Sequence, residues 1–228
     1  MRFHSYYTDN LPEQIQIDHQ RCAEKFGIEI VYHKDKFISV DAAYTAHGNC
    51  LTQFMTEDPE DVVCFLDLDC LIYNLDTLKK VFEWVKYNKS FAGNAQNISH
   101  TVTKNRLYAA ASMLIIHKEA WNYLGRPDLA WSMQGGIQID TAQSLSLKAD
   151  EVGFNYQLLY PIGYDGDRNT YRLGTYGQYG TGTMYPGSWH YFRISDFHQD
   201  IPELWTNRVN NILNQELIVP KNISYHYA

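Results

Sequence analysis

Residues 62–72 read VVCFLDLDCLI, and this stretch decides the fold that we expect for the chain. Five apolar residues run without a break into Asp67-Leu68-Asp69, and apolar residues resume immediately afterwards. A short apolar run is typical of a strand buried on both faces, as in a parallel sheet. Ligands bind such sheets just beyond the carboxyl ends of the strands. We therefore expect Asp67 and Asp69 at that edge, with both side chains on one side of the strand.

Two carboxylates this close repel each other and lose solvation when they are partly buried. A cation removes both costs, and hard oxygen ligands suit Mg²⁺ or Mn²⁺, which keep open positions for phosphate oxygens. The competing interpretation is a strand that ends in a solvated, Asp-rich turn.

Composition limits the function classes. The 228 residues suit one α/β domain, and 45% hydrophobic residues allow a full core. A formal charge of −7 argues against a nucleic-acid partner, because phosphate binding needs clustered Lys and Arg. The chain has 18 Tyr and 5 Trp, which can stack on sugar or base faces or simply fill the core. We expect one domain at 1–213 and a C-terminal tail at 214–228.

The four cysteines at 22, 50, 64 and 70 form no C-x-x-C pair, which makes a zinc site unexpected. Two of them flank the Asp-Leu-Asp segment and are expected as buried thiols of a reducing compartment. Residues 1–4 begin no apolar leader segment, and no apolar run is long enough to span a membrane. These features predict a cytoplasmic protein without a transmembrane segment.

The periodicity of the chain predicts alternating strands and helices. Strands are expected at 3–8, 28–32, 90–93, 107–116 and 154–160, besides the central one. Helices are expected after Asn10, Ser39 and Asn74 or Asp76 as N-caps, over 139–152, and from Asp200 to Leu213. The crossovers before the central strand are long enough for parallel pairing. No G-x-G-x-x-G is present, which disfavours a dinucleotide site.

The segment Phe65–Ile72 resembles the metal-binding D-x-D strand of GT-A type glycosyltransferases, in the nucleotide-diphospho-sugar transferase superfamily. The resemblance implies a single Rossmann-like α/β domain with a mixed, mostly parallel sheet and helices on both faces. It also implies hexosyl transfer from a nucleotide-diphosphate sugar to a saccharide or protein acceptor. Asp67 and Asp69 would then bind Mn²⁺ or Mg²⁺, with Asp67 also facing the donor and Asp69 also counted as catalytic.

The resemblance extends to residues after the central motif. A His near the C-terminus completes the metal site in many GT-A enzymes, and His190 lies where that ligand is expected. Arg193 is the expected partner of the diphosphate, although a Gly that separates the equivalent pair in glycogenin-like galactosyltransferases is missing here. Ser112 lies in a small-residue stretch that would border the donor sugar, with tight packing as the alternative. Asp140 is expected either as the base that deprotonates the acceptor hydroxyl or as a helix N-cap.

Residues before the motif are candidates for donor binding. Tyr6, Tyr7 and Thr8 end the first strand, where GT-A enzymes hold the nucleotide base and ribose, and packing under the sheet is the alternative. His47 falls on the apolar face of the helix that leads to the central strand. It is a candidate for contact with the donor, or it is a buried core histidine.

Residues 163–188 are rich in Gly and Tyr and nearly free of aliphatic residues. A segment of this kind is expected to be a flexible lid over the donor or acceptor, or a surface loop. Asp165 and Asp167 within it are weaker candidates for acceptor contact.

Three other functions compete with glycosyl transfer. In a haloacid-dehalogenase-type phosphatase, the first Asp of a D-x-D is a nucleophile and Asp165-Gly166-Asp167 would form an acidic metal loop. That family expects Thr or Val at position 71 and places the motif on the first strand. A sugar-nucleotide pyrophosphorylase would need a Gly-rich basic loop after the first strand, which is absent. A non-catalytic sugar- or nucleotide-binding module is the third alternative.

Overall fold

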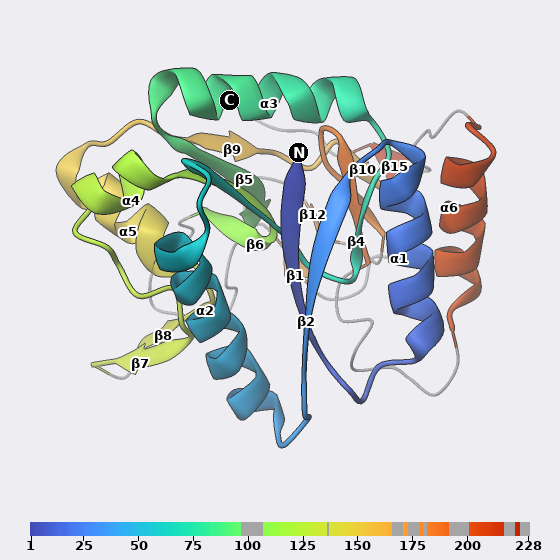
Figure 1. Ribbon diagram of the computed structural model, residues 1–228, viewed down its shortest axis with the longest axis horizontal. Coiled ribbons are helices and arrows are strands. Elements are labelled where there is room, and N and C mark those ends of the chain that lie inside the picture. Colours follow the sequence, from blue (N-terminus) through green and yellow to red (C-terminus); the bar gives the residue numbers. More distant parts are fainter. Residues whose placement is uncertain are drawn as a thin grey trace.

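The computed structural model describes residues 1–96, 107–135, 137–165, 171–172, 178–179, 182–191, 201–216 and 222–223. A six-stranded sheet in the order β2-β1-β3-β6-β5-β9 lies at its centre (Figure 1). Its strands are β1 (Arg2–Thr8), β2 (Glu29–Asp35), β3 (Val62–Leu66), β5 (Phe91–Gln96), β6 (Tyr108–His117) and β9 (Gln157–Leu159). All pairings are parallel except those of β6 with β3 and β5. The predicted mixed, mostly parallel sheet is confirmed.

Helices cover both faces of this sheet, as predicted. They are α1 (Glu13–Lys25), α2 (Val40–Glu57), α3 (Leu75–Asn88), α4 (Lys118–Tyr123), α5 (Gln143–Val152) and α6 (Glu203–Leu213). Val63 and Phe65 of β3 pack in a cluster with side chains of α2, α4 and α5. Cys64 and Leu66 pack in another cluster with α1 and α3. The unbroken apolar run of β3 follows from this burial on both faces.

Local capping signals place two of the helix starts correctly. Ser39 accepts a hydrogen bond from the Ala42 amide at 3.2 Å, and Asn74 accepts one from the Thr77 amide at 3.0 Å. The expected cap of the first helix is wrong, because its N-cap is Pro12. Asn10 instead accepts a hydrogen bond from the Thr8 hydroxyl at 2.6 Å. Proline satisfies the geometry of a helix start without a side-chain cap.

A second sheet runs in the order β15-β10-β13-β14-β4. Its strands are β4 (Cys70–Ile72), β10 (Gly163–Tyr164), β13 (Thr183–Met184), β14 (Ser188–His190) and β15 (Asn222–Ile223). Both ends of the predicted lid therefore lie in buried strands, and most of the segment between them lies outside the described residues, so the lid stays a prediction. The tail, to which no structure was assigned, supplies β15. In two further small sheets, β7 (Ser132–Gln134) pairs antiparallel with β8 (Ile137–Ile139), and β11 (Tyr171–Arg172) pairs antiparallel with β12 (Gln178–Tyr179).

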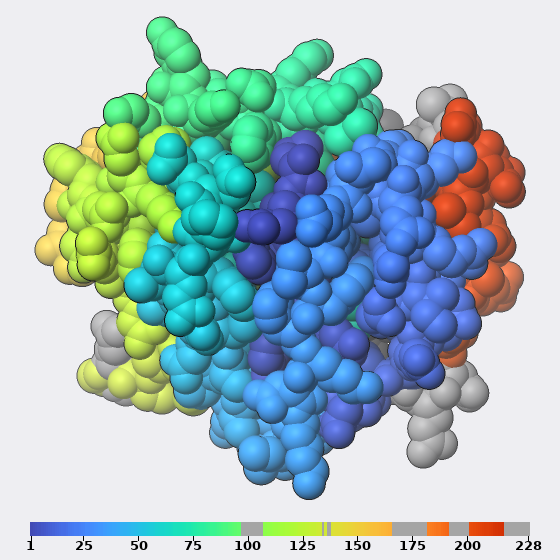
Figure 2. All heavy atoms as spheres, viewed as in Figure 1, coloured from blue at the N-terminus to red at the C-terminus, as the bar shows by residue number. Residues whose placement is uncertain are grey.

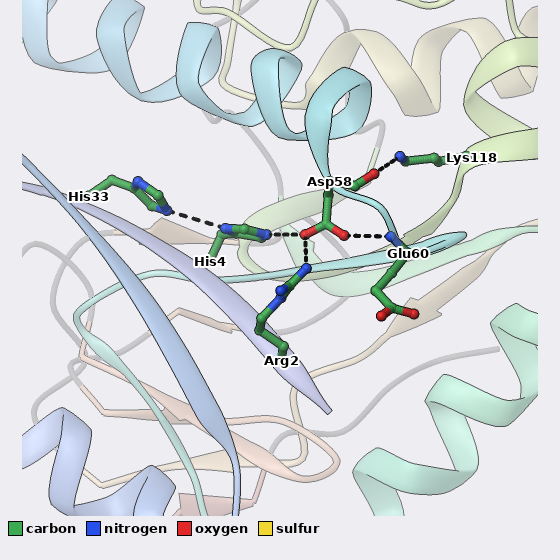
Figure 3. Close-up of polar contacts among 6 residues, drawn as sticks. All are labelled: Arg2, His4, His33, Asp58, Glu60 and Lys118. Atoms are coloured by element: carbon green, nitrogen blue, oxygen red, sulfur yellow. Dashed lines mark hydrogen bonds and ion pairs between the residues drawn. The ribbon is translucent and has the colours of Figure 1, made fainter.

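A polar network fastens the amino-terminal end of β1 to the link between α2 and β3 (Figure 3). Asp58 Oδ2 accepts from Arg2 Nη2 at 2.7 Å and lies 2.6 Å from His4 Nε2, and Oδ1 accepts from the Glu60 amide at 2.8 Å. Lys118 donates to the Asp58 carbonyl. At the opposite end of β1, the connection from β2 to α2 projects from the molecule (Figures 1 and 2). The carboxyl ends of β1 and β2, and the site described next, lie toward that end.

Candidate active site

The Asp67–Asp69 segment is a tight turn that joins the two sheets. The Cys70 amide donates to the Asp67 carbonyl at 2.9 Å, so β3 ends at Leu66 and β4 begins immediately after the turn. The Asp67 amide donates to the Ser112 carbonyl of β6 at 3.1 Å, which fastens the turn to the central sheet. We expected both side chains on one side of the strand, but the strand ends at Leu66 and the two carboxylates lie in the turn that follows it. Their position beyond the carboxyl end of β3 is as expected.

Each carboxylate of the turn is paired with an imidazole from a distant part of the chain. His47 Nε2 of α2 lies 3.2 Å from Asp67 Oδ1, and His190 Nε2 of β14 lies 3.2 Å from Asp69 Oδ1. Sheet register places the second pair, since β14 runs antiparallel to β4 with His190 opposite Cys70. The Tyr191 amide also donates to the Asp69 carbonyl at 2.8 Å. Two of the predicted metal ligands, Asp69 and His190, are thus neighbours.

The charges of these groups are coupled. Burial lowers the pKa of His47, but the carboxylates of Asp67, Asp140 and Asp69 together raise it above the usual 6.5. The pKa of His190 is likewise raised, because Asp69 and Asp67 together outweigh burial. Burial raises the pKa of Asp67, yet the surrounding imidazoles, His47 first among them, together lower it below its usual value. The shifts of His47, His190 and Asp67 therefore favour the charged forms of these side chains at the end of a buried strand.

Asp140 lies in the loop between β8 and α5 and is held by Tyr108. The Tyr108 hydroxyl donates to Asp140 Oδ2, and the Thr141 amide donates to Oδ1 at 2.9 Å. Burial raises the pKa of Asp140, and the field of Asp67 adds to this rise. The helix expected over 139–152 begins only at Gln143, with Ala142 as its N-cap, so the N-cap role of Asp140 is wrong.

Amide side chains connect the Asp140 side of the site to the His190 side. Tyr108 also lies in hydrogen-bonding distance of Gln96 Oε1 at 3.2 Å, and Gln96 Nε2 lies 3.5 Å from His190 Nδ1. Ser112 Oγ accepts from Gln96 at 3.5 Å and from Asn94 at 3.3 Å. Ser112 is buried and its hydroxyl belongs to this network, while its place beside the donor sugar stays a prediction. Sequence reasoning gave no role to Tyr108, Gln96 or Asn94.

The three residues at the end of β1 divide between the two faces of the sheet. Tyr6 stacks on His47, with ring centroids 5.3 Å apart and an interplanar angle of 8°. Tyr7 meets Tyr32 edge-on at 6.1 Å and belongs to the cluster around α1 and α6. Thr8 is buried and uses its hydroxyl for a local bond to Asn10. Of the three, Tyr6 is the one that contacts a residue paired with the Asp67–Asp69 turn.

Two predicted residues, Arg193 and Asp167, lie outside the described residues. Asp165 does not fit a role in acceptor contact, because it is buried and accepts hydrogen bonds from Arg208 and from Trp189 Nε1, the latter at 3.0 Å. The same contacts count against an acidic metal loop of the phosphatase type at this position.

The oxygen ligands that the turn offers are of the type that a divalent cation prefers. Asp67 and Asp69 offer carboxylate oxygens, and their side chains keep 26% and 17% of their exposure, so solvent ions can reach them. The structure holds these groups as two carboxylate–imidazole pairs. Within the described residues, no three His, Cys, Asp or Glu side chains form one ready-made metal cluster. Asp67, Asp69 and His190 are therefore not drawn together into the single cluster that we expected.

Several of the solved structures to which the chain is similar are glycosyltransferases. The galactosyltransferase LgtC, solved with donor and acceptor sugar analogues, matches with a TM-score of 0.49 and 13% identity over 97% of this chain and 98% of that one. The Drosophila β1,4-galactosyltransferase 7, in a mutant complex with manganese, UDP-Gal and xylobiose, matches with a TM-score of 0.42 and 13% identity over 91% of this chain and 79% of that one. No protein-family model and no curated protein matches the chain. Likeness at these levels decides neither family nor substrate.

One buried histidine behind the turn was missed by sequence reasoning. His19 of α1 lies on the same helical face as Ile15 and Cys22, and that periodicity was the signal that could have found it. The ring is buried, and its Nδ1 lies 2.8 Å from the Tyr32 hydroxyl.

Other features bear less on the site. A cavity of about 510 Å³ lies at the amino-terminal end of the strands, lined by residues that include Arg2, Glu29, Asp58 and Lys86. It is separate from the Asp67–Asp69 turn, which is at the carboxyl end of β3.

Among the helices of the described residues, none combines the length and the hydropathy that a membrane-spanning segment needs.

Proposed function

We propose that this protein is a metal-dependent glycosyltransferase of the hexosyltransferase type, which moves a sugar from a nucleotide-diphosphate sugar to an acceptor hydroxyl. One observation carries the proposal. Two partly open carboxylates sit on a turn beyond the carboxyl end of a buried strand, and each is paired with a histidine from a different element. This edge of an α/β sheet is where such folds bind ligands.

The chemistry of the leaving group calls for positive charge. Asp67, Asp69 and His190 are the residues that would hold Mn²⁺ or Mg²⁺, which when bound neutralises the charge that builds up on the departing diphosphate. His47, whose pKa is raised by Asp67, brings a further hydrogen-bond donor, its ring N–H, to the same turn. Tyr6, stacked on His47, presents an aromatic ring beside the turn on which a nucleotide base can pack.

The acceptor hydroxyl must lose a proton as the new glycosidic bond forms. Asp140 is our candidate for this base, because burial raises its pKa and so makes its carboxylate a better proton acceptor at neutral pH. Tyr108 fixes the orientation of the carboxylate through the hydrogen bond to Oδ2. Holding donor and acceptor side by side supplies much of the remaining rate enhancement.

The direct test is metal binding by the purified protein. Wild-type protein should bind Mn²⁺, detected by loss of the free-ion signal in electron paramagnetic resonance, and should bind UDP more tightly when Mn²⁺ is present. Asp69→Asn removes one negative ligand while keeping the shape of the side chain, and we expect it to weaken Mn²⁺ binding at least about 10-fold. Asp61→Asn is the matched control, because Asp61 is exposed at the other end of β3.

Transfer activity is then measured as nucleotide release from a panel of nucleotide sugars. If wild-type protein bound no Mn²⁺, or if Asp69→Asn bound it as well as wild type, the proposal would be wrong. Release of p-nitrophenol from p-nitrophenyl phosphate with Mg²⁺ would instead support the phosphatase. Binding of UDP without turnover of any donor would support the non-catalytic module.

A further inference from the structure

The pairing of β5 with β6 is irregular beside the Asp67–Asp69 turn. Gly93 pairs with Leu114, but the next residue, Asn94, pairs with Ala110, so the register skips residues 111–113 of β6. The skipped stretch includes Ser112, whose carbonyl accepts the hydrogen bond from the Asp67 amide. Bulges next to functional sites commonly redirect a side chain. The side chain to consider here is that of Asn94, the first residue of β5 after the irregularity.

Asn94 is a fully buried amide at the junction of the two sheets. Its Nδ2 donates to Ser112 Oγ at 3.3 Å and, more weakly, to Cys70 Sγ at 3.9 Å, while Oδ1 accepts from the Ser188 hydroxyl at 3.2 Å. Both N–H groups and the carbonyl oxygen of the amide are thereby used. One side chain thus joins β5 to β6 of the central sheet and to β4 and β14 of the second sheet.

The contact with Ser188 bears on a candidate metal ligand of the same strand. Side chains alternate along a strand, so Ser188 and His190 lie on one face of β14. Opposite this face, Asn94 of β5 bonds Ser188, and Gln96, two residues further along β5, lies 3.5 Å from Nδ1 of His190. Holding Ser188 therefore holds the face of β14 that presents His190 to Asp69.

Stability by itself does not call for an asparagine at this position. An apolar side chain of similar size has no polar group to desolvate, and replacing all partners of a buried hydrogen bond by apolar groups can leave stability nearly unchanged. A polar network in which every member is bonded instead specifies one arrangement of the segments that it joins.

We infer that Asn94 is a positioning residue, which fixes β14 against the Asp67–Asp69 turn and so sets the distance from His190 to the two carboxylates. The inference rests on the proposed function, because that distance matters for binding a metal ion. Asn94 acts through Ser188 on one side and Ser112 on the other.

The test compares two Ser→Ala substitutions that each remove one buried hydroxyl. Ser188→Ala removes the donor to Asn94, and we expect it to weaken Mn²⁺ binding about 10-fold, the lower end of what loss of an outer contact to a metal site costs. Ser90→Ala is the matched control, because the Ser90 hydroxyl donates to the Asn155 carbonyl at 2.6 Å at the opposite end of β5. It should leave Mn²⁺ affinity unchanged.

A double substitution tests whether the effect of Ser188 passes through Asn94. Asn94→Leu should also weaken Mn²⁺ binding, and adding Ser188→Ala to it should cause little further loss, since the shared contact is already gone. If Ser188→Ala weakened Mn²⁺ binding by the same factor in both backgrounds, the two residues would act independently and the inference would be wrong.

Hydrogen exchange of the Tyr191 amide, which donates to the Asp69 carbonyl, gives a readout that needs no metal. It should be faster than wild type in Ser188→Ala and unchanged in Ser90→Ala. If wild type binds Mn²⁺ and Ser188→Ala binds it equally well, the inference fails while the proposed function stands, whether or not exchange at Tyr191 changes. If wild type binds no Mn²⁺, the proposed function fails and the inference fails with it.

Discussion

Gly48 lies in the interior of α2, one residue after His47, where ordinary helix propensity favours alanine. A Cβ at this position would lie 2.2 Å from Ala130 Cα, 2.5 Å from the Leu129 oxygen and 2.7 Å from the Ala130 nitrogen. All three are main-chain atoms, so no side chain can rotate out of the way. The segment that carries them is itself fixed, because the Leu129 amide donates to Thr52 at 3.0 Å and its carbonyl accepts from Ala142 at 2.9 Å.

The magnitude follows from two opposing effects. Replacing Gly with Ala in a helix interior stabilises by about 1 kcal/mol. Overpacking costs about 1–3 kcal/mol, and a rigid main-chain neighbour places this site at the upper end. To reach ordinary van der Waals contact, α2 has to move by roughly 1 Å. We therefore expect Gly48→Ala to lower the free energy of unfolding by about 2 kcal/mol, or the melting temperature by about 4–8 °C for a chain of this length.

The assay is urea unfolding followed by circular dichroism and tryptophan fluorescence. Asn49→Ala is the control, since Asn49 is the exposed neighbour in the same helix and its replacement should be neutral or slightly stabilising. The same displacement moves His47 away from Asp67, so Gly48→Ala should also weaken Mn²⁺ binding while Asn49→Ala does not. A Gly48→Ala protein as stable as wild type would refute the reasoning, because it would mean that α2 and the Leu129–Ala130 segment are not in close contact.

Two further predictions concern stability. Asn74→Ala removes the side-chain cap of α3 and should lower the free energy of unfolding by about 1 kcal/mol, measured by urea unfolding. An unchanged free energy of unfolding would show that solvent satisfies the Thr77 amide equally well. Burial lowers the pKa of His4 below 6.5 despite the neighbouring Asp58, so the unfolded chain takes up a proton at a higher pH than the folded one. The free energy of unfolding should therefore fall as the pH drops below about 6.5, and the urea midpoint of His4→Gln should fall less between about pH 7 and pH 5 than that of wild type. Equal slopes for the two proteins would contradict the role of His4.

The amino-acid sequence by itself determined the features that depend on neighbouring residues. The apolar run of β3 predicted a strand buried on both faces, because each of its side chains has to leave water whichever way it points. Ser39 and Asn74 predicted helix starts, since each side chain bonds an amide three residues further along the chain. The strand–helix alternation predicted the parallel pairing of β1 with β2 and β3.

The tertiary structure decided what the candidate site contains. Whether Asp140 caps a helix, and whether residues 163 and 188 lie in strands, depended on partners such as Tyr108 and β15 that no local pattern reveals. His47 and His190 reach the same turn from α2 and β14. Helix packing and the register of β14 against β4 bring these imidazoles together, and both are fixed by contacts between segments far apart in the chain. Spacing along the sequence shows which side chains share one face of an element, but only the packing of elements determines which faces meet.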